Sequence, residues 1–144
     1  VRACGAVSVT LSQLLSQSDY ISVHVPLTGE TKGLLGKDEF HAMKEGVILV
    51  NTSRGSVVDE NWLCRALESG RIGAAGLDVF EKEPLPEASP LRRFPNVILT
   101  SHMAYHSVES LSELKRGAAM NVASVLAGNP PLWPVNLVVK KGTS

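Results

Sequence analysis

Short apolar runs alternate along the chain with segments in which apolar residues recur every three or four positions. The apolar runs favour β-strands, which we predict at residues 20–25, 47–50, 74–80 and 96–100. The recurring pattern favours helices, which we predict at residues 37–44, 59–69 and 107–126, and residues 1–15 are expected to lead into a further short helix. Strands that alternate with helices are typical of βαβ units. The pattern therefore predicts an α/β fold with a parallel sheet and right-handed crossovers.

Three of these segments carry further detail. The run at residues 47–50 is apolar without alternation, which is typical of a strand covered on both faces of a parallel sheet. Asp59 suits the N-cap of the next helix, and Gly70 suits its end. The inner stripe of that helix is expected to consist of Trp62, Leu63, Ala66 and Leu67. The long helix carries a similar stripe, formed by Leu111, Leu114, Ala118, Val122 and Val125.

The composition narrows the class of protein. The chain has 144 residues, a hydrophobic share of 44% and a formal net charge of zero, which fits one globular domain with a buried core. Because the chain lacks a basic or acidic block, it is not expected to bind nucleic acid directly, and its apolar runs are too short to cross a membrane. The two cysteines lie far apart, and no His or Cys stands at metal-ligand spacing. We therefore expect no metal, and a reducing cytoplasm as the compartment.

Polar side chains that follow the predicted strands are the candidates for chemistry. Ligands of parallel α/β sheets bind outside the carboxyl ends of the strands. Arg54 follows the second predicted strand, and His102 follows the fourth. Asp78 closes the apolar part of the third, with Glu81 and Glu83 shortly after it. Each residue alone fits a solvated loop, but together they bring a guanidinium, a carboxylate and an imidazole to one edge of the sheet.

This combination suits reversible hydride transfer at a 2-hydroxy or 2-oxo acid. The imidazole of His102 would exchange a proton with the substrate oxygen, because imidazole titrates near neutral pH. A neighbouring carboxylate would orient the ring and favour its protonated form. The planar fork of Arg54 would bind the substrate carboxylate and polarise the carbonyl. Since no side chain supplies hydride, a nicotinamide cofactor is implied.

Four runs of residues resemble the D-2-hydroxyacid dehydrogenase family. They are LVNTSRG at residues 49–55, VDE at 58–60, GLDVFEKEP at 76–84 and SH at 101–102. The runs follow one another in the family's order, and the resemblance as a whole covers nearly the whole chain. The resemblance implies that Arg54 binds the substrate, that His102 is the catalytic acid and base, and that Glu83 is its carboxylate partner. Glu81 is the alternative partner, but the family places the active carboxylate just before the proline.

The resemblance also implies a set of residues around the cofactor. The run HVPLT at residues 24–28, with Thr31, is similar to the family's loop beside the cofactor, and Thr52 and Ser53 are similar to its contacts on the ribose side. Asp78 matches a position beside the nicotinamide. The full set expected to bind NAD, with NADP as the alternative, is Val25, Pro26, Leu27, Thr28, Thr31, Thr52, Ser53, Arg54, Asp78, His102, Ala104 and Tyr105.

Two departures from the family's pattern bear on the extent of the domain and on its branch. The chain has no Gly-x-Gly-x-x-Gly turn, so the pyrophosphate-binding unit is expected upstream of Val1. We therefore expect a partial Rossmann-like, doubly wound domain at residues 1–128 that is inactive alone. A tail at residues 129–144 is expected to pack on a substrate domain outside this chain. Position 105 holds the aromatic Tyr105 where many members have small residues, which is similar to the C-terminal-binding-protein branch.

Three interpretations follow, in order of preference. The first is the C-terminal part of an NAD-dependent dehydrogenase of a small D-2-hydroxy or 2-oxo acid, cytoplasmic and homodimeric in its full-length form. The second is a dehydrogenase-like corepressor or scaffold controlled by NAD, which Tyr105 favours and for which a nuclear location would fit. The third is a receiver-like regulatory domain with Asp78 as phosphoacceptor. It is disfavoured because no paired acidic residues follow the first predicted strand.

Overall fold

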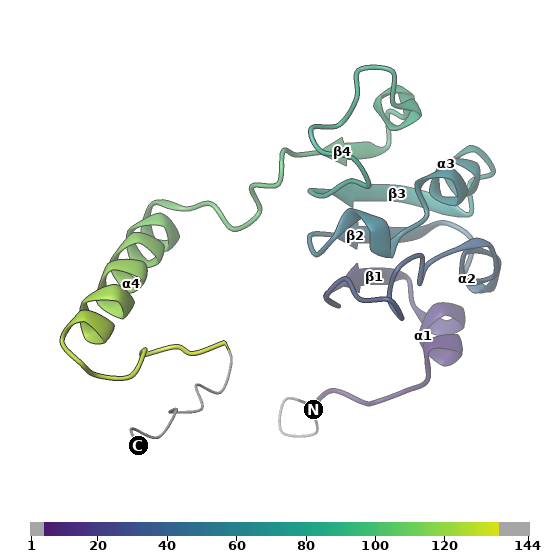
Figure 1. The fold of residues 1–144 in the computed structure, drawn as a ribbon. Helices are drawn as coiled ribbons and strands as arrows, with labels where there is room; N and C mark the ends of the chain where they lie inside the picture. The colour runs from purple at the N-terminus through teal and green to yellow at the C-terminus, as the bar shows by residue number, and fades with distance from the viewer. Residues whose placement is uncertain (1–4, 136–144) are drawn as a thin grey trace. The chain divides into compact units, whose positions relative to one another are not determined.

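The computed structural model describes residues 5–135. Within them, four parallel strands form one sheet in the order β1-β2-β3-β4. The strands are β1 (Tyr20–Val23), β2 (Val47–Asn51), β3 (Ile72–Leu77) and β4 (Val97–Leu99). Their arrows point the same way in Figure 1, so their carboxyl ends lie at one edge of the sheet. The predicted parallel, Rossmann-like α/β fold is confirmed.

Capping residues define where the helices begin. The helices are α1 (Leu11–Gln17), α2 (Lys37–Ala42), α3 (Glu60–Glu68) and α4 (Val108–Leu126), with short 3-10 turns at Gly55–Val57 and Pro90–Arg93. Thr10, Asp59 and Ser107 precede α1, α3 and α4, and each side chain accepts a hydrogen bond from a backbone N–H of the first turn. The predicted N-cap role of Asp59 is confirmed. No helix within residues 5–135 combines the length and the apolar character needed to cross a bilayer.

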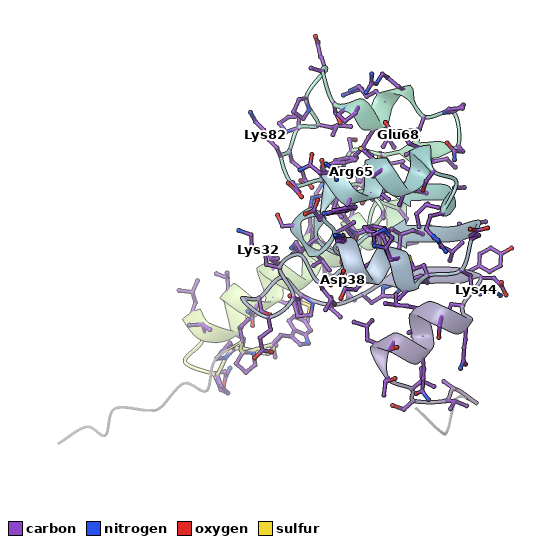
Figure 2. All side chains as sticks on the ribbon, turned by 90° about the vertical axis from the view of Figure 1, so that its right-hand side faces the viewer. Lys32, Asp38, Lys44, Arg65, Glu68 and Lys82 are labelled. Carbon is purple, nitrogen blue, oxygen red and sulfur yellow. The ribbon has the colours of Figure 1, made fainter. Side chains whose placement is uncertain are left out.

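The core lies on the face of the sheet that α2 and α3 cover. Leu49 and Ile72 from the strands pack there with Phe40 of α2 and Leu63 of α3. Figure 2 looks towards these helices, whose charged side chains, such as Asp38, Arg65 and Glu68, are exposed. This face therefore anchors the strands whose ends carry the candidate residues.

The predicted inner stripe of α3 needs one correction. Leu63, Ala66 and Leu67 are buried as expected. Trp62 is only half-buried: it packs against the margin of the core, and the guanidinium of Arg65 lies over its ring, with the carbon 4.6 Å from the ring centroid. The indole therefore lies at the surface of the helix and interacts with a cation.

Two predicted strands end before their apolar runs do. β1 ends at Val23 and β3 at Leu77, since both pair with β2 and that pairing stops at Asn51. Val79 and Phe80 are buried outside the sheet, which accounts for the longer apolar run.

The prediction for β2 is right for one face of the strand and wrong for the other. Val47 and Leu49 are buried, whereas Ile48 and Val50 are only half-buried. Apolar residues at all four positions had suggested equal cover on both faces.

A second compact unit begins at Tyr105. The predicted boundary after residue 128 thus lies inside this unit. None of the residues of α4 is buried, so its predicted stripe is exposed or half-buried. The first part of the tail turns back onto α4: the N–H of Leu132 donates to the Asn121 side chain (2.8 Å), and the Ser124 hydroxyl donates to the carbonyl of Pro130 (2.8 Å). The packing of the tail on a substrate domain stays a prediction, and residues 136–144 lie outside the described part of the chain.

Candidate active site

The strand register brings the candidate residues to one edge of the sheet. Asn51 of β2 is level with Leu77 of β3, which is level with Leu99 of β4. The segments that follow these three residues carry the guanidinium, the carboxylates and the imidazole that the sequence singled out. The sheet therefore delivers all three groups to the side where parallel sheets bind ligands.

The turn after β2 is built around the buried side chain of Asn51, which is 1% exposed. Its Oδ1 accepts hydrogen bonds from the N–H (3.0 Å) and the hydroxyl (2.9 Å) of Ser53, and its Nδ2 donates to the carbonyl of Arg54 (3.0 Å). These bonds leave the Arg54 side chain exposed, with Nη1 donating to the carbonyl of Ser53 (2.7 Å). Most of the guanidinium fork is thus free to bind an anion.

The turn after β4 wraps around the carboxylate of Asp78, which is 4% exposed. This carboxylate accepts hydrogen bonds from the N–H groups of Met103 and Ala104 (2.9 Å each) and from the Thr100 hydroxyl. Burial alone would raise the pKa of Asp78, but the bonds from Thr100, Ala104 and Met103 outweigh it and hold the pKa below its ordinary value. Asp78 is therefore ionised and buried, and its hydrogen bonds hold residues 100–104 in their turn.

His102 occupies an unusual backbone conformation within this turn. Its φ is 54°, in the left-handed region that non-glycine residues rarely adopt. The backbone N–H of His102 donates to the carbonyl of Asp78 (2.8 Å), so Asp78 binds the turn through both its side chain and its main chain. Backbone strain of this kind persists only where the surrounding bonds enforce it, and it is common at functional sites.

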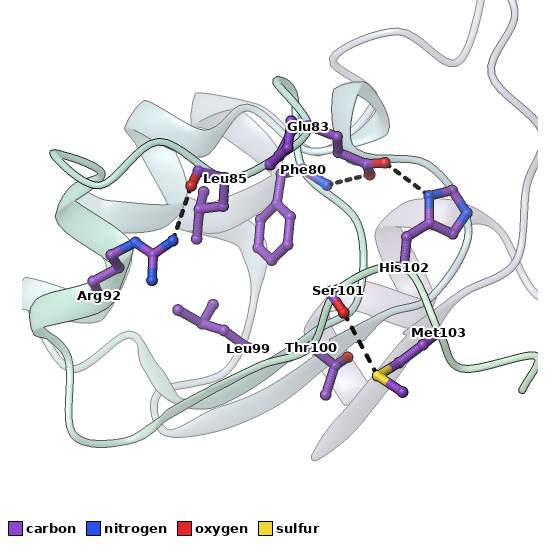
Figure 3. A pocket seen from close by; sticks show the side chains of 10 residues that line it. Phe80, Glu83, Leu85, Arg92, Leu99, Thr100, Ser101, His102 and Met103 are labelled. Carbon is purple, nitrogen blue, oxygen red and sulfur yellow. Dashed lines mark hydrogen bonds and ion pairs between the residues drawn. The ribbon is translucent and has the colours of Figure 1, made fainter.

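His102 and Glu83 form a hydrogen-bonded pair at the same edge. The distance from Nδ1 of His102 to Oε2 of Glu83 is 2.8 Å, and Oε1 of Glu83 accepts from the N–H of Phe80 (3.1 Å; Figure 3). The hydrogen bond from His102, with a smaller contribution from Phe80, holds the pKa of Glu83 below its ordinary value. Glu83 is thus an ionised acceptor, so Nδ1 carries the hydrogen and Nε2 is left to exchange a proton.

A cavity of about 670 Å³ adjoins this pair. Its lining consists of Phe80, Glu83, Pro84, Leu85, Arg92, Leu99, Thr100, Ser101, His102 and Met103. Figure 3 shows the second ring nitrogen of His102 directed away from Phe80, Leu85 and Leu99. His102 and Glu83 thus line the cavity, and the proton-exchanging nitrogen points away from its apolar residues.

The loop after β1, predicted to flank the cofactor, is held by hydrogen bonds within itself. Thr28 and Thr31 exchange backbone-to-hydroxyl bonds (2.7 and 3.2 Å), and the Thr31 hydroxyl donates to the carbonyl of Pro26 (2.6 Å). Pro26 and Leu27 are exposed, and Val25 is half-buried. These bonds fix the shape of the loop, and its exposed residues present an open surface.

The remaining predicted cofactor contacts fall into two groups. Thr52 is exposed in the turn after β2, and Ala104 is held by Asp78 in the turn after β4. Tyr105 belongs to the second unit, where its ring meets that of His106 edge-on at 5.9 Å. Thr52 and Ala104 thus lie at the edge of the sheet that carries the Glu83–His102 pair. Tyr105 belongs to the second unit.

Two residues that determine the structure of this edge, Asn51 and Gly55, are not among the candidates predicted from the sequence. Asn51 had been assigned only to a turn, although a polar residue that closes an apolar strand was a usable signal. Gly55 gave no such signal: a Cβ at this position would lie 1.9 Å from the carbonyl carbon of Phe80, so no other residue fits there. The turn that carries Arg54 therefore packs directly on the turn that carries Glu83.

Comparison with known proteins agrees with this geometry. The family described as D-isomer specific 2-hydroxyacid dehydrogenase, NAD binding domain, matches residues 1–104. The glyoxylate reductase of Korarchaeum cryptofilum is 45% identical over 137 residues, which are 95% of this chain and 41% of that protein. The chain thus spans about two fifths of the length of this relative.

Two solved structures resemble the chain in fold and in sequence. The holo form of D-mandelate dehydrogenase from Rhodotorula graminis has a TM-score of 0.88 at 38% identity, over 96% of this chain and 40% of that one. A D-isomer specific 2-hydroxyacid dehydrogenase from Xanthobacter autotrophicus Py2, in complex with NADPH and MES, has a TM-score of 0.75 at 39% identity, over 88% of this chain and 51% of that one. The family's domain binds NAD, and one of its members holds NADPH, so NAD(P) is the cofactor class. The chain belongs to the D-isomer specific 2-hydroxyacid dehydrogenase family, in which residues 1–104 lie within the NAD binding domain.

Proposed function

We propose that this chain is the C-terminal portion of an NAD(P)-linked oxidoreductase that interconverts a small 2-oxo acid and the matching D-2-hydroxy acid. The observation that carries the proposal is the Glu83–His102 pair: an ionised carboxylate bonded to Nδ1 of an imidazole, at the ligand-binding edge of the sheet. The similarity to a glyoxylate reductase and to a D-mandelate dehydrogenase supports this substrate class.

His102 serves as the acid and base of the proposed reaction. In reduction, Nε2 donates a proton to the carbonyl oxygen of the substrate as that oxygen gains charge. Glu83 holds Nδ1–H throughout, which fixes the ring orientation and stabilises the imidazolium. In oxidation, the same Nε2 accepts the hydroxyl proton. The half-exposed position of the ring allows the proton to exchange with solvent between turnovers.

Arg54 binds the substrate carboxylate. Its guanidinium is exposed, and Ser53 occupies one of its five N–H donors. Two parallel N–H groups match the geometry of a carboxylate, and the positive charge also stabilises the oxygen that becomes negative in the reaction. Lysine would keep the charge but lose the fork.

The residues present fit a nicotinamide cofactor. When bound, it supplies hydride to the 2-oxo carbon or takes it from the 2-hydroxy carbon. The loop of Val25, Pro26, Leu27, Thr28 and Thr31 would flank it, with Thr52, Ser53 and Ala104 as further contacts. The Asp78 carboxylate accepts three hydrogen bonds from its own chain. A carboxylate can accept about four, so one further bond from an amide N–H of the cofactor would be possible.

The proposal extends to the whole protein. It includes an upstream glycine-rich turn for the pyrophosphate, a separate substrate domain, a homodimer and a cytoplasmic location. The alternative is a scaffold or corepressor that binds NAD(H) without turnover. Tyr105 favours that alternative, whereas the complete Glu83–His102 pair favours chemistry.

The deciding experiment measures NADH oxidation by the full-length enzyme with glyoxylate, hydroxypyruvate and phenylglyoxylate. We expect turnover with at least one of them, a loss of about 1,000-fold in His102→Gln, and unchanged NADH binding in that variant. His41→Gln, on α2, is the matched control and should behave like the parent. The 144-residue chain alone should bind NADH poorly because it lacks the pyrophosphate contacts. NADH binding by the full-length protein without turnover of any 2-oxo acid would favour the scaffold instead.

A further inference from the structure

The turn that carries Glu83 is joined to the start of α3 by two glutamates that exchange hydrogen bonds. The N–H of Glu81 donates to Oε1 of Glu60 (2.6 Å), and the N–H of Glu60 donates to Oε1 of Glu81 (3.1 Å). Each carboxylate thus accepts from the backbone of the other residue, across 21 positions of sequence. The Glu60 N–H belongs to the first turn of α3, where such donors have no partner within the helix.

The same turn is pressed against the segment of Arg54. The position of Gly55 leaves no room for a Cβ, which would lie 1.9 Å from the carbonyl carbon and 2.0 Å from the carbonyl oxygen of Phe80. One peptide group, between Phe80 and Glu81, therefore contacts Gly55 through its carbonyl side and Glu60 through its N–H. The segments of both proposed functional groups meet at this peptide.

The buried Phe80 and the half-buried Leu85 anchor the two ends of the turn, and the residues between them bury little surface. Residues 81–84 are exposed and lie outside every helix and strand, so few apolar contacts determine their conformation. Their shape rests on the exchange between Glu60 and Glu81 and on the bond from the Phe80 N–H to Glu83.

The exchange also brings two like charges together. Burial raises the pKa of Glu60, the N–H of Glu81 offsets part of that rise, and the charge of Glu81 adds to it. A glutamine at position 60 would keep the accepting oxygen and remove the repulsion. The hydrogen bond and the charge can therefore be tested separately.

We propose that Glu60 and Glu81 are positioning residues, which hold the turn so that the Glu83 carboxylate reaches Nδ1 of His102. They touch neither substrate nor cofactor in this role. The inference rests on the proposed function for its catalytic meaning, but its geometric content concerns this chain alone.

The test compares Glu60→Ala and Glu60→Gln, with Glu68→Ala on the exposed side of α3 as the matched control. NMR of the chain follows the titration of the Glu83 carboxyl carbon and the ring nitrogens of His102. In Glu60→Ala we expect the pKa of Glu83 to rise towards its ordinary value, and His102 to lose the signature of a bonded Nδ1–H. Glu60→Gln and Glu68→Ala should both resemble the parent.

Turnover by the full-length enzyme provides the second measurement. Glu60→Ala should lower kcat by about 10-fold with KM changed less than about 3-fold, and Glu60→Gln should restore most of the loss. The proposal is overturned if Glu60→Ala only lowers stability and leaves both the Glu83 titration and the His102 spectrum of the folded protein unchanged. It is also overturned if Glu60→Gln is as impaired as Glu60→Ala. If the parent reduces no 2-oxo acid, the proposed function fails, and the NMR result still decides the positioning.

Discussion

Two carboxylates stand five residues apart at one edge of the sheet, and their surroundings are opposite. Asp78 is 4% exposed, and three donors of its own chain occupy its oxygens. The Glu83 side chain is 37% exposed. Its carboxylate forms one hydrogen bond with the backbone N–H of Phe80 and one with the imidazole of His102. Both have a lowered pKa, so both are ionised. The difference in burial suits the first to holding the fold and the second to the proposed chemistry. Three of the four experiments below test that division, and the one on Arg54 tests the substrate clamp beside it.

The largest effect is expected for Asp78→Ala. The change leaves two buried N–H groups and a hydroxyl without their acceptor, at about 1–3 kcal/mol for each group that stays dry. The free energy of unfolding of the chain should fall by about 4 kcal/mol, measured by urea titration. Glu87→Ala, at an exposed carboxylate, is the control and should change it by less than about 0.5 kcal/mol. A loss below about 1 kcal/mol for Asp78→Ala would remove the structural role.

Glu83→Gln should lower turnover and leave stability almost unchanged, which is the reverse of the result expected for Asp78→Ala. The side chain is exposed, so the free energy of unfolding should change by no more than about 0.5 kcal/mol. Turnover by the full-length enzyme should fall by about 100-fold, because an amide holds the imidazolium less well than a carboxylate does. Steady-state assays with NADH and a 2-oxo acid measure this effect, with Glu87→Gln as the control. Loss of stability without loss of turnover would reverse the division between the two carboxylates.

A smaller effect is expected from Arg54→Lys. The charge remains but the bidentate fork is lost, so KM for the oxo acid should rise by about 10-fold while kcat changes less. Arg93→Lys, an exposed arginine outside the site, should match the parent. Normal saturation behaviour in Arg54→Lys would contradict the carboxylate clamp.

The smallest effect concerns acid. The pKa of Glu83 is lower in the folded chain than in the unfolded chain, so its stabilising contribution is complete above the ordinary glutamate pKa and disappears as the pH falls through the folded value. Because the pair is exposed, that contribution is about 0.3 kcal/mol. Urea titrations should therefore show Glu83→Gln less stable than the parent by this amount at neutral pH and equal to it in strong acid. If Glu83→Gln is still less stable than the parent in strong acid, the difference in stability has a cause other than the ionisation of Glu83.

The local part of the fold could be predicted from the sequence. The helix after Asp59 and the long helix after Ser107 appear close to their expected ends, because capping side chains and helical spacing act within a few residues. The parallel arrangement of the strands follows from the alternation of strand and helix, whereas their order in the sheet does not. The ends of β1 and β3 were placed too late, because they depend on where the neighbouring strand stops pairing.

The candidate site could be predicted only as a set of residues. Glu81 and Glu83 both follow the strand end within six residues, and the structure separates their roles: Glu83 bonds to His102, and Glu81 to the backbone of Glu60. The position of Asp78 beside the nicotinamide stays a prediction, and its bonds to Met103 and Ala104, which span 25 and 26 residues, were not predicted. Contacts at such separations depend on the assembled sheet, and no local pattern encodes them. Asn51 is a different case, because its bonds to Ser53 and Arg54 span only two and three residues, so its role was open to prediction from the local sequence.

The left-handed backbone of His102 has a consequence for substitutions at this position. An imidazole at this position is kept against the local conformational preference of the main chain, which glycine or asparagine would satisfy more easily. In the proposed enzyme, His102→Gly or His102→Asn would therefore remove the acid and base of the reaction and relax the turn in a single substitution. Folding and turnover thus make opposite demands on this one residue.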